Sequence, residues 1–98
     1  MDVCFDLNGV RFVWDRAKAR RNSTTHDGVA FERAVEAFFD PFLRVVMADR
    51  NDEARDAIVG YDISGRLLFV VHVEIDEQVI RIISARKATL KEREYYDS

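Results

Sequence analysis

The chain has 98 residues, a hydrophobic fraction of 48% and a formal net charge of −3 at pH 7, which predict one folded domain over residues 1–98. Its single cysteine, Cys4, excludes an intrachain disulfide and a thiolate zinc site. The longest apolar run, Leu67–Val71, is much shorter than the roughly 20 residues that a membrane span needs, and the first residues lack the basic segment of a secretory signal. We therefore expect a cytoplasmic protein that makes no membrane contact.

The charges are distributed unevenly along the chain. Residues 11–21 and residues 81–93 each carry five cations and one acid, whereas residues 27–62 carry nine acids and four arginines. Two basic segments thus flank an acidic middle. Because association with a nucleic acid follows the local field, this pattern is compatible with RNA binding, but solvated helix faces produce the same pattern.

The first third of the chain predicts a hairpin and a short basic helix. Asn8-Gly9 is the strongest short-range signal for a two-residue type I′ turn, and Asp15 has the chemistry of a helix N-cap. The residues from Asn22 to Gly28 are turn formers and should end the helix. The expected elements are strands over Val3–Asp6 and Val10–Trp14 and a helix over Arg16–Arg21.

The remaining residues predict a second helix, four strands and a final helix. An apolar stripe at helical spacing begins at Phe31 and ends before Pro41, and we expect its aromatic residues to lie in the core. Thr89 and Glu92 have the spacing of a capping box, which opens a helix to about Asp97. The strands are expected over Leu43–Met47, Ala57–Tyr61, Leu67–Ile75 and Val79–Ala85.

Short connections between these strands leave no room for crossover helices, so the strands should be antiparallel. The predicted fold is therefore an α+β domain with an N-terminal β-hairpin, two helices, a four-strand antiparallel meander and a C-terminal helix. We expect the helices to cover one face of the sheet.

Alternation along residues 67–75 assigns each side chain to a face of the sheet. The apolar set, which we expect to lie beneath the helices, is Leu67, Phe69, Val71, Val73 and Ile75; the open set is Leu68, Val70, His72 and Glu74. If Asp76-Glu77 is a two-residue loop, His72 lies opposite Arg81 and Glu74 lies diagonal to it, and the three form a cluster on the open face. This register turns Ser84 and Arg86 to the covered face.

A three-residue loop would instead place His72 opposite Ile82 and turn Arg81 to the other face. We favour the shorter loop because it leaves the Arg81 charge on the open face.

A histidine, a carboxylate and an arginine can together support RNA cleavage without a metal. Such a reaction needs a base for the ribose 2′-hydroxyl, an acid for the leaving oxygen and a cation for the charge on phosphorus. The same three residues also make an ordinary cross-strand ion pair beside a histidine, so spacing leaves both interpretations open. His26 and His72 lack ligand spacing and the glycines form no phosphate-binding loop, so we expect no metal and no other cofactor.

Several runs of residues resemble the BrnT family of bacterial toxins. The N-terminal runs are Phe12-Val13-Trp14-Asp15, Lys18-Ala19, Asn22, His26, Gly28-Val29 and Phe31-Glu32. The C-terminal runs, which are more specific to the family, are Gly65-Arg66-Leu67-Leu68, Val70-Val71-His72, Glu74, Arg81–Thr89 and Glu92-Arg93. The resemblance implies a RelE-like fold and a metal-independent ribonuclease toxin of a type II toxin–antitoxin system. It also implies a BrnA-type ribbon-helix-helix antitoxin, with operator DNA bound only through the complex.

From this resemblance we carry over Lys18, His26, His72, Glu74, Arg81, Arg86 and Lys87 as site positions. Our hypothesis is an endoribonuclease that inhibits translation, with His72 as acid/base, Glu74 as orienter or second acid/base, and Arg81 and Arg86 as charge stabilisers. The residues expected to contact RNA are Lys18, Arg21, His26 and Lys87.

Two departures from the family pattern favour an alternative. Thr25 stands at a position where the family has lysine, and Asp27 precedes Gly28, so a cation is lost and an anion gained. Both changes weaken phosphate binding, and the alternative is an inactive or attenuated homologue that still binds the antitoxin. A DNA-binding regulator is a third possibility, but the sequence shows no recognition-helix signature.

Overall fold

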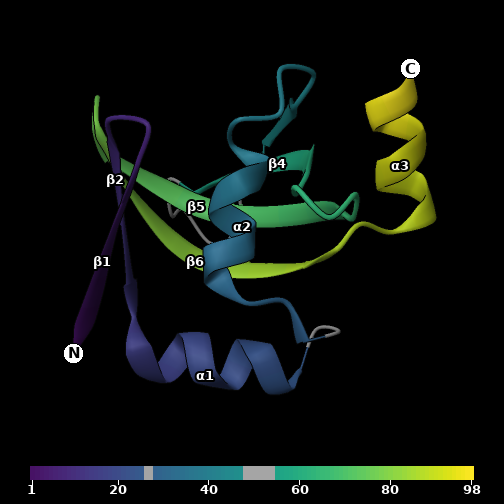
Figure 1. Ribbon diagram of the computed structural model, residues 1–98. Coiled ribbons are helices and arrows are strands. Elements are labelled where there is room, and N and C mark those ends of the chain that lie inside the picture. The colour runs from purple at the N-terminus through teal and green to yellow at the C-terminus, as the bar shows by residue number, and fades with distance from the viewer. Residues whose placement is uncertain (26–27, 48–54) are drawn as a thin grey trace.

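The computed structural model describes residues 1–25, 28–47 and 55–98, with only the backbone of Met47. These residues form a six-stranded sheet crossed by a central helix (Figure 1). The elements in chain order are β1 (Asp2–Leu7), β2 (Val10–Asp15), α1 (Arg16–Thr24), α2 (Phe31–Ala37), β3 (Arg44–Met47), β4 (Asp56–Tyr61), β5 (Leu67–Asp76), β6 (Val79–Lys87) and α3 (Leu90–Asp97).

The N-terminal hairpin is confirmed. β1 and β2 pair antiparallel from Asp2–Asp15 to Leu7–Val10, and the two turn residues between them both have positive φ, 52° at Asn8 and 82° at Gly9. Positive φ at both central positions is the requirement of a type I′ turn, which explains the asparagine and the glycine.

The four-strand antiparallel meander is also confirmed, but it is part of a larger sheet. The strand order is β1-β2-β6-β5-β4-β3, so the hairpin joins the meander through β2 and β6. This contact is parallel and spans only three pairs, from Arg11–Val79 to Val13–Arg81. Beyond Arg81, β2 leaves β6, and the edge of β6 becomes available to α1.

Helix α1 begins where predicted and continues further than predicted. The Asp15 carboxylate accepts a hydrogen bond of 3.0 Å from the Lys18 N–H, as an N-cap does. The helix runs to Thr24, and in its last turn the hydroxyls of Ser23 and Thr24 donate to carbonyls of the preceding turn, at 3.0 Å to Ala19 and 2.9 Å to Arg21. These turn-forming residues are thus accommodated within the last turn.

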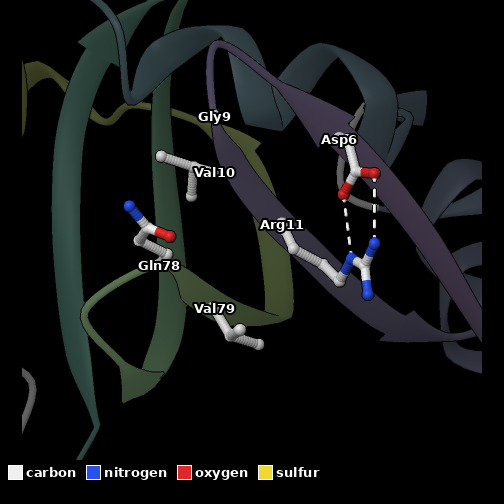
Figure 2. Close-up of a pocket in the computed structure, with 6 residues that line it drawn as sticks. All are labelled: Asp6, Gly9, Val10, Arg11, Gln78 and Val79. Carbon is white, nitrogen blue, oxygen red and sulfur yellow. Dashed lines mark hydrogen bonds and ion pairs between the residues drawn. The ribbon is translucent and has the colours of Figure 1, made fainter.

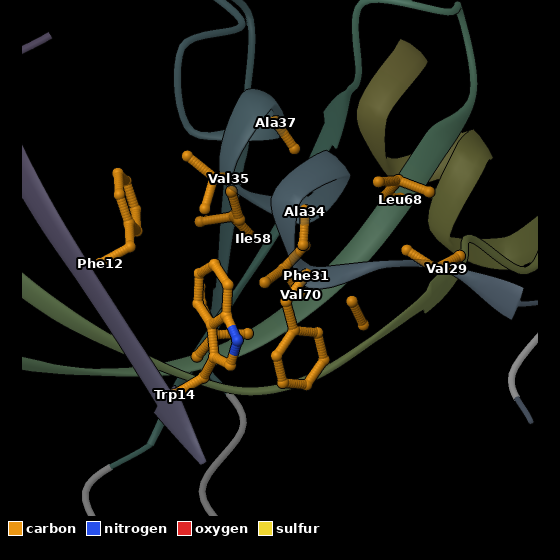
Figure 3. Packing of buried hydrophobic residues seen from close by; sticks show 12 residues of the cluster. Phe12, Trp14, Val29, Phe31, Ala34, Val35, Ala37, Ile58, Leu68 and Val70 are labelled. Atoms are coloured by element: carbon orange, nitrogen blue, oxygen red, sulfur yellow. The ribbon is translucent and has the colours of Figure 1, made fainter. Parts of the chain in front are cut away.

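The core lies between α2 and the sheet (Figure 3). Trp14 of β2 is 1% exposed and its ring meets that of Phe31 edge-on, with centroids 5.8 Å apart. Phe31, Ala34 and Val35 of α2 are buried, which confirms that the aromatic stripe is a core feature, while Phe39 lies at its margin with 37% exposure.

The prediction of which face of β5 is covered was wrong. Leu68 and Val70 pack in the core together with Ile82 and Ala85 of β6, and His72 contacts Phe38. We call this the α2 face. By alternation, Phe69 and Val71 of β5 and Arg81, Ser84 and Arg86 of β6 lie on the opposite face.

We call that opposite face the α3 face, because α3 packs on it. Tyr96 of α3 meets the ring of Tyr61 at 5.3 Å between centroids, and Arg93 donates to the Tyr61 hydroxyl. Along β4, Tyr61 points to the same side of the sheet as the buried Val59. Ile58, which belongs to the core beneath α2, points to the other side. The expectation that the helices cover one face is therefore wrong for α3. Because both faces of the sheet are covered near the start of β5, apolar residues occupy consecutive positions there and do not alternate with polar ones.

Helix α3 begins with the predicted capping box. The Thr89 hydroxyl accepts from the Glu92 N–H at 3.2 Å, and the Glu92 carboxylate accepts from the Thr89 N–H at 2.8 Å. Within the described ranges, no helix has the length and apolar character that crossing a membrane requires.

Candidate functional site

Two irregularities in the β5–β6 ladder decide how the predicted site residues are arranged. The hairpin loop is Glu77-Gln78 and Asp76 pairs with Val79, so Ile75 is an extra residue on β5. A second shift leaves Ile83 as an extra residue on β6, because Val71 pairs with Ser84 while His72 pairs with Ile82. His72 is thus opposite Ile82, and the predicted pairing of His72 with Arg81 was wrong.

The predicted cluster of His72, Glu74 and Arg81 is consequently split between the two faces. His72 and Glu74 have the parity of the α2 face, and Arg81, opposite Val73, lies on the α3 face. The bulge at Ile83 also corrects the prediction for Ser84 and Arg86, which lie on the α3 face with Arg81.

His72 is a core residue in this structure. Its side chain is buried, its ring meets Phe38 edge-on at 4.8 Å, and its Nδ1 lies 3.4 Å from the Val70 carbonyl. Burial lowers the pKa of His72 below its ordinary value of 6.5, so the ring is neutral near pH 7. Glu74 is exposed near the hairpin end of the strand.

Both predicted arginines make internal ion pairs. Arg81 reaches across β2 to the carboxylate of Asp2. Arg86 donates two hydrogen bonds of 2.8 Å to the two oxygens of Glu92, and its guanidinium lies 4.3 Å from the centroid of Phe69. Burial would raise the pKa of Glu92, but the hydrogen bonds from Arg86 and Thr89 hold that pKa below its usual value. Arg86 retains 33% side-chain exposure.

A second group of predicted residues is brought together where α1 meets β6. The Asn22 side chain, 5% exposed, donates 2.8 Å hydrogen bonds to the carbonyls of Ala85 and Val29 and accepts from the Ala85 N–H at 3.2 Å. These bonds place the second half of α1 beside the last residues of β6. We call this junction, with the cations Lys18, Arg21, Arg86 and Lys87 beside it, the α1–β6 seam.

The cations of α1 lie on two different flanks. Ala19 packs against the core, on one side of Asn22. At about 100° of rotation per residue, Lys18 and Arg21 lie on the other side of Asn22, towards the α3 face on which Arg86 projects. Arg16 and Arg20 lie on the outer flank, away from Asn22.

Three of the four seam cations are available to a ligand. Lys18, Arg21 and Lys87 are exposed, and within the described part of the chain none of them forms an ion pair with a carboxylate. The remaining predicted RNA contact, His26, and the departure at Asp27 lie outside the described residues. Thr25 caps α1, where its N–H bonds to Arg21 and Asn22 carbonyls.

An open depression lies at the opposite end of β6, between the two hairpin turns (Figure 2). It is lined by Asp6, Gly9, Val10, Arg11, Gln78 and Val79. Figure 2 shows that its one guanidinium, that of Arg11, is bound to the Asp6 carboxylate, at 2.9 Å from Nε. The α1–β6 seam is therefore the better candidate for binding an anion.

Sequence reasoning missed the partners that organise these charges. Asn22 was interpreted as a turn residue, and its contact with Ala85 spans 63 positions, so local spacing carries no signal for it. Glu92 was interpreted only as a capping residue, although the nearby basic run from Arg86 was a signal for an ion pair. In the described ranges, no group of three or more His, Cys, Asp or Glu side chains is arranged to hold a metal ion.

Comparison with known proteins identifies the family. A family model described as the ribonuclease toxin BrnT of type II toxin–antitoxin systems matches residues 14–92, which include the seam but not β1. The crystal structure of the Brucella abortus ribonuclease toxin BrnT is similar, with 21% sequence identity, a TM-score of 0.52, and coverage of 78% of this chain and 92% of that chain. This likeness confirms the predicted α+β fold class.

The search of curated proteins gave no match. The family model nevertheless covers most of the chain, including both of the basic elements that form the seam. The chain therefore belongs to the BrnT family of ribonuclease toxins of type II toxin–antitoxin systems.

Proposed function

We propose that this protein is a metal-independent endoribonuclease toxin that binds RNA across the α1–β6 seam. The observation that carries the proposal is the pair of Asn22–Ala85 hydrogen bonds, which brings α1, the helix of Lys18 and Arg21, beside the end of β6, where Arg86 and Lys87 follow Ala85. Lysine and arginine side chains supply the phosphate contacts that dominate affinity for nucleic acids. Family membership supports RNA as the substrate.

The proposed reaction is attack by the ribose 2′-oxygen on the adjacent phosphorus. The P–O5′ bond breaks, and the products are a 2′,3′-cyclic phosphate and a 5′-hydroxyl, with no co-reactant consumed. Negative charge accumulates on the phosphoryl oxygens in the transition state, and a fixed guanidinium stabilises it. The geometry favours Arg86 for this role over Arg81, because Arg86 lies at the seam and its guanidinium is held by both Phe69 and Glu92.

The assignment of His72 as acid/base is less well supported by its position. A general acid or base must come within hydrogen-bonding reach of the proton that it transfers, and His72 is buried against Phe38. His72→Phe separates the two roles of the ring. Retained cleavage in this variant means that the histidine serves packing, and loss of cleavage with an intact fold means that its nitrogens serve chemistry.

The test is cleavage of an oligoribonucleotide in excess chelator by the wild type and four variants. Cleavage should persist with chelator, fall about a hundredfold in Arg86→Ala, and fall strongly in Lys87→Ala and in Lys18→Ala/Arg21→Ala. The matched control, Arg16→Ala/Arg20→Ala, removes two cations from the outer flank of the same helix and should cleave nearly as well as the wild type. Loss of cleavage on chelation, or equal losses in the two α1 double variants, would contradict the proposal.

An attenuated toxin that serves as an antitoxin-binding module is the second candidate. It is favoured by one observation: Arg81 and Arg86 are both neutralised by carboxylates. Expression of the chain alone distinguishes the two, because an active toxin arrests growth and an attenuated one does not. In either case we propose a cytoplasmic complex with a BrnA-type ribbon-helix-helix antitoxin, through which alone operator DNA is bound.

A further inference from the structure

The side chain of Asn22 connects three separate parts of the chain. Its amide nitrogen donates to the carbonyls of Val29, after α1, and of Ala85, in β6, both at 2.8 Å, while its oxygen accepts from the Ala85 N–H at 3.2 Å. In this pair of bonds to Ala85, the amide side chain acts as a strand neighbour would, with one donor and one acceptor.

The bonds are made at a place where β6 has lost its strand partner. Pairing of β2 with β6 ends at Val13–Arg81, and β2 then turns away into α1. A strand edge that is buried without hydrogen bonds is costly, and the edge at Ala85 is buried. Asn22 satisfies that edge and at the same time fixes the rotation of α1 about its own axis.

This rotation decides where the α1 cations lie. Lys18 is one turn before Asn22 and Arg21 is next to it, whereas Arg86 is next to Ala85. A rotation of α1 by one residue would turn Lys18 and Arg21 away from Arg86 and bring other side chains to the seam. The polar, exposed surface of α1 offers few apolar contacts that could fix this rotation instead, since Asn22 is its one buried residue.

We infer that Asn22 is a positioning residue for RNA binding: it holds Lys18 and Arg21 in register with Arg86, so that successive phosphates are bound together. The inference rests on the proposed function, because it specifies how the same site is assembled. Asn22 itself makes no contact with RNA.

The test is a double-mutant cycle on the affinity for an uncleavable, fully 2′-O-methylated oligoribonucleotide. The four chains are the wild type, Asn22→Ala, Lys18→Ala/Arg21→Ala, and the triple variant. If Asn22 acts through the two cations, Asn22→Ala raises Kd about tenfold in the wild-type background. In the background without the cations it raises Kd less than about twofold, because nothing remains to be positioned.

A control separates positioning from general destabilisation. Val35→Ala truncates a buried residue of α2, away from the seam, and lowers the thermal midpoint without changing Kd. Asn22→Ser, which keeps a hydroxyl and perturbs the fold less, serves if Asn22→Ala does not fold, and should show the same non-additivity.

Two results overturn the inference while leaving the proposed function intact: equal losses of affinity on changing Asn22 in both backgrounds, or an Asn22→Ala affinity equal to the wild type. A third result, an affinity of Lys18→Ala/Arg21→Ala equal to the wild type, overturns the proposed site and the inference with it.

Discussion

At the scale of single residues, Ile83 decides which side chains of β6 share a face. It is the extra residue of a β-bulge, and without it Ser84 and Arg86 would point to the opposite side of the sheet from Arg81. The bulge leaves Ile82 and Ala85 in the core and keeps Arg86 on the α3 face with Arg81, while Lys87, which pairs with Leu68, has the parity of the α2 face. The extra residue Ile83 thus returns Arg86 to the face of Arg81. The separation of His72 from Arg81 arises at the hairpin end, where Ile75 is extra and His72 pairs with Ile82.

His72 makes the stability of the fold depend on pH. Above pH 6.5 its ring is neutral in both the folded and the unfolded chain. Because burial lowers the folded-state pKa, the unfolded chain takes up the proton first as the pH falls below 6.5, and the free energy of unfolding decreases down to the folded-state pKa.

We predict that His72→Phe, which keeps an aromatic ring against Phe38, removes this decrease. Urea denaturation at pH 7 and pH 5.5 measures it. His26→Gln, which removes the other histidine of the chain, should retain the decrease, and an equal decrease in the wild type and His72→Phe would contradict the assignment.

At the scale of elements, α3 is held mainly by polar contacts, since it contributes no buried residue. Its contacts are the Arg86–Glu92 pair, the Arg93–Tyr61 hydrogen bond and hydrogen bonds from the Tyr95 and Tyr96 hydroxyls to the Val45 carbonyl and Asp40. Burial and the bond to Asp40 raise the pKa of Tyr96 to about 12. The helix is therefore an element whose attachment depends on a few named side chains.

Glu92→Gln tests the strongest of these contacts. This change removes the negative charge to which two guanidinium nitrogens of Arg86 donate hydrogen bonds. It should lower the free energy of unfolding by about 1–2 kcal/mol, a modest amount because the ion pair is partly exposed. Glu94→Gln, on an exposed position of the same helix, should change it by less than about 0.5 kcal/mol. Thermal or urea denaturation compares the two, and equal losses would mean that the pair does not anchor α3.

The close packing of α2 on β4 leads to a second prediction at the scale of elements. A Cβ at Gly60 would lie 2.6 Å from the Ala37 carbonyl oxygen, so Gly60→Ala must push α2 away from the sheet and should cost about 1–3 kcal/mol. Gly65→Asn, at a positive φ where a Cβ meets no atom within 4 Å, should cost less than about 1 kcal/mol. Denaturant midpoints of the two variants check this, and similar midpoints would contradict the packing.

At the scale of the molecule, the net charge of −3 does not describe the surface that a ligand meets. Three acids of the acidic middle of the chain are used internally: Glu36 pairs with Arg33, Asp62 with Arg66, and Asp40 accepts from Tyr96 and from backbone N–H groups. The cations of α1 largely lack such partners in the described chain. The field at the seam is therefore more positive than the composition suggests.

The parts of this fold that could be predicted are those fixed by local hydrogen bonds. Asn8-Gly9, the Asp15 cap and the Thr89 capping box each satisfy backbone groups within a few residues. The parts that could not be predicted depend on contacts between distant segments. The parallel pairing of β2 with β6, the bulge at Ile83 and the Asn22–Ala85 bonds follow from how the sheet closes, and spacing along the chain carries no signal for them.

The same distinction applies to the site. Sequence identified Lys18, Arg21, Arg86 and Lys87 as candidates through basic segments and family resemblance, and the Asn22–Ala85 bonds place their two elements, α1 and β6, side by side. The prediction from sequence also placed His72 on an open face beside Arg81. That placement depended on an assumed two-residue loop and on a β5–β6 ladder without bulges. A one-residue shift in the loop or in the ladder moves every side chain beyond it to the other face of the sheet.

The salt dependence of RNA binding tests the central claim most directly, because each phosphate contact contributes about 0.7 to the slope of log Kd against log salt for a single strand. With the 2′-O-methylated oligoribonucleotide, Lys18→Ala/Arg21→Ala should lower this slope by about 1.4. Arg16→Ala/Arg20→Ala, which removes two cations from the outer flank of the same helix, should lower it by less than half as much. Equal reductions in the two double variants, or no reduction in the first, would show that RNA is not held at the α1–β6 seam.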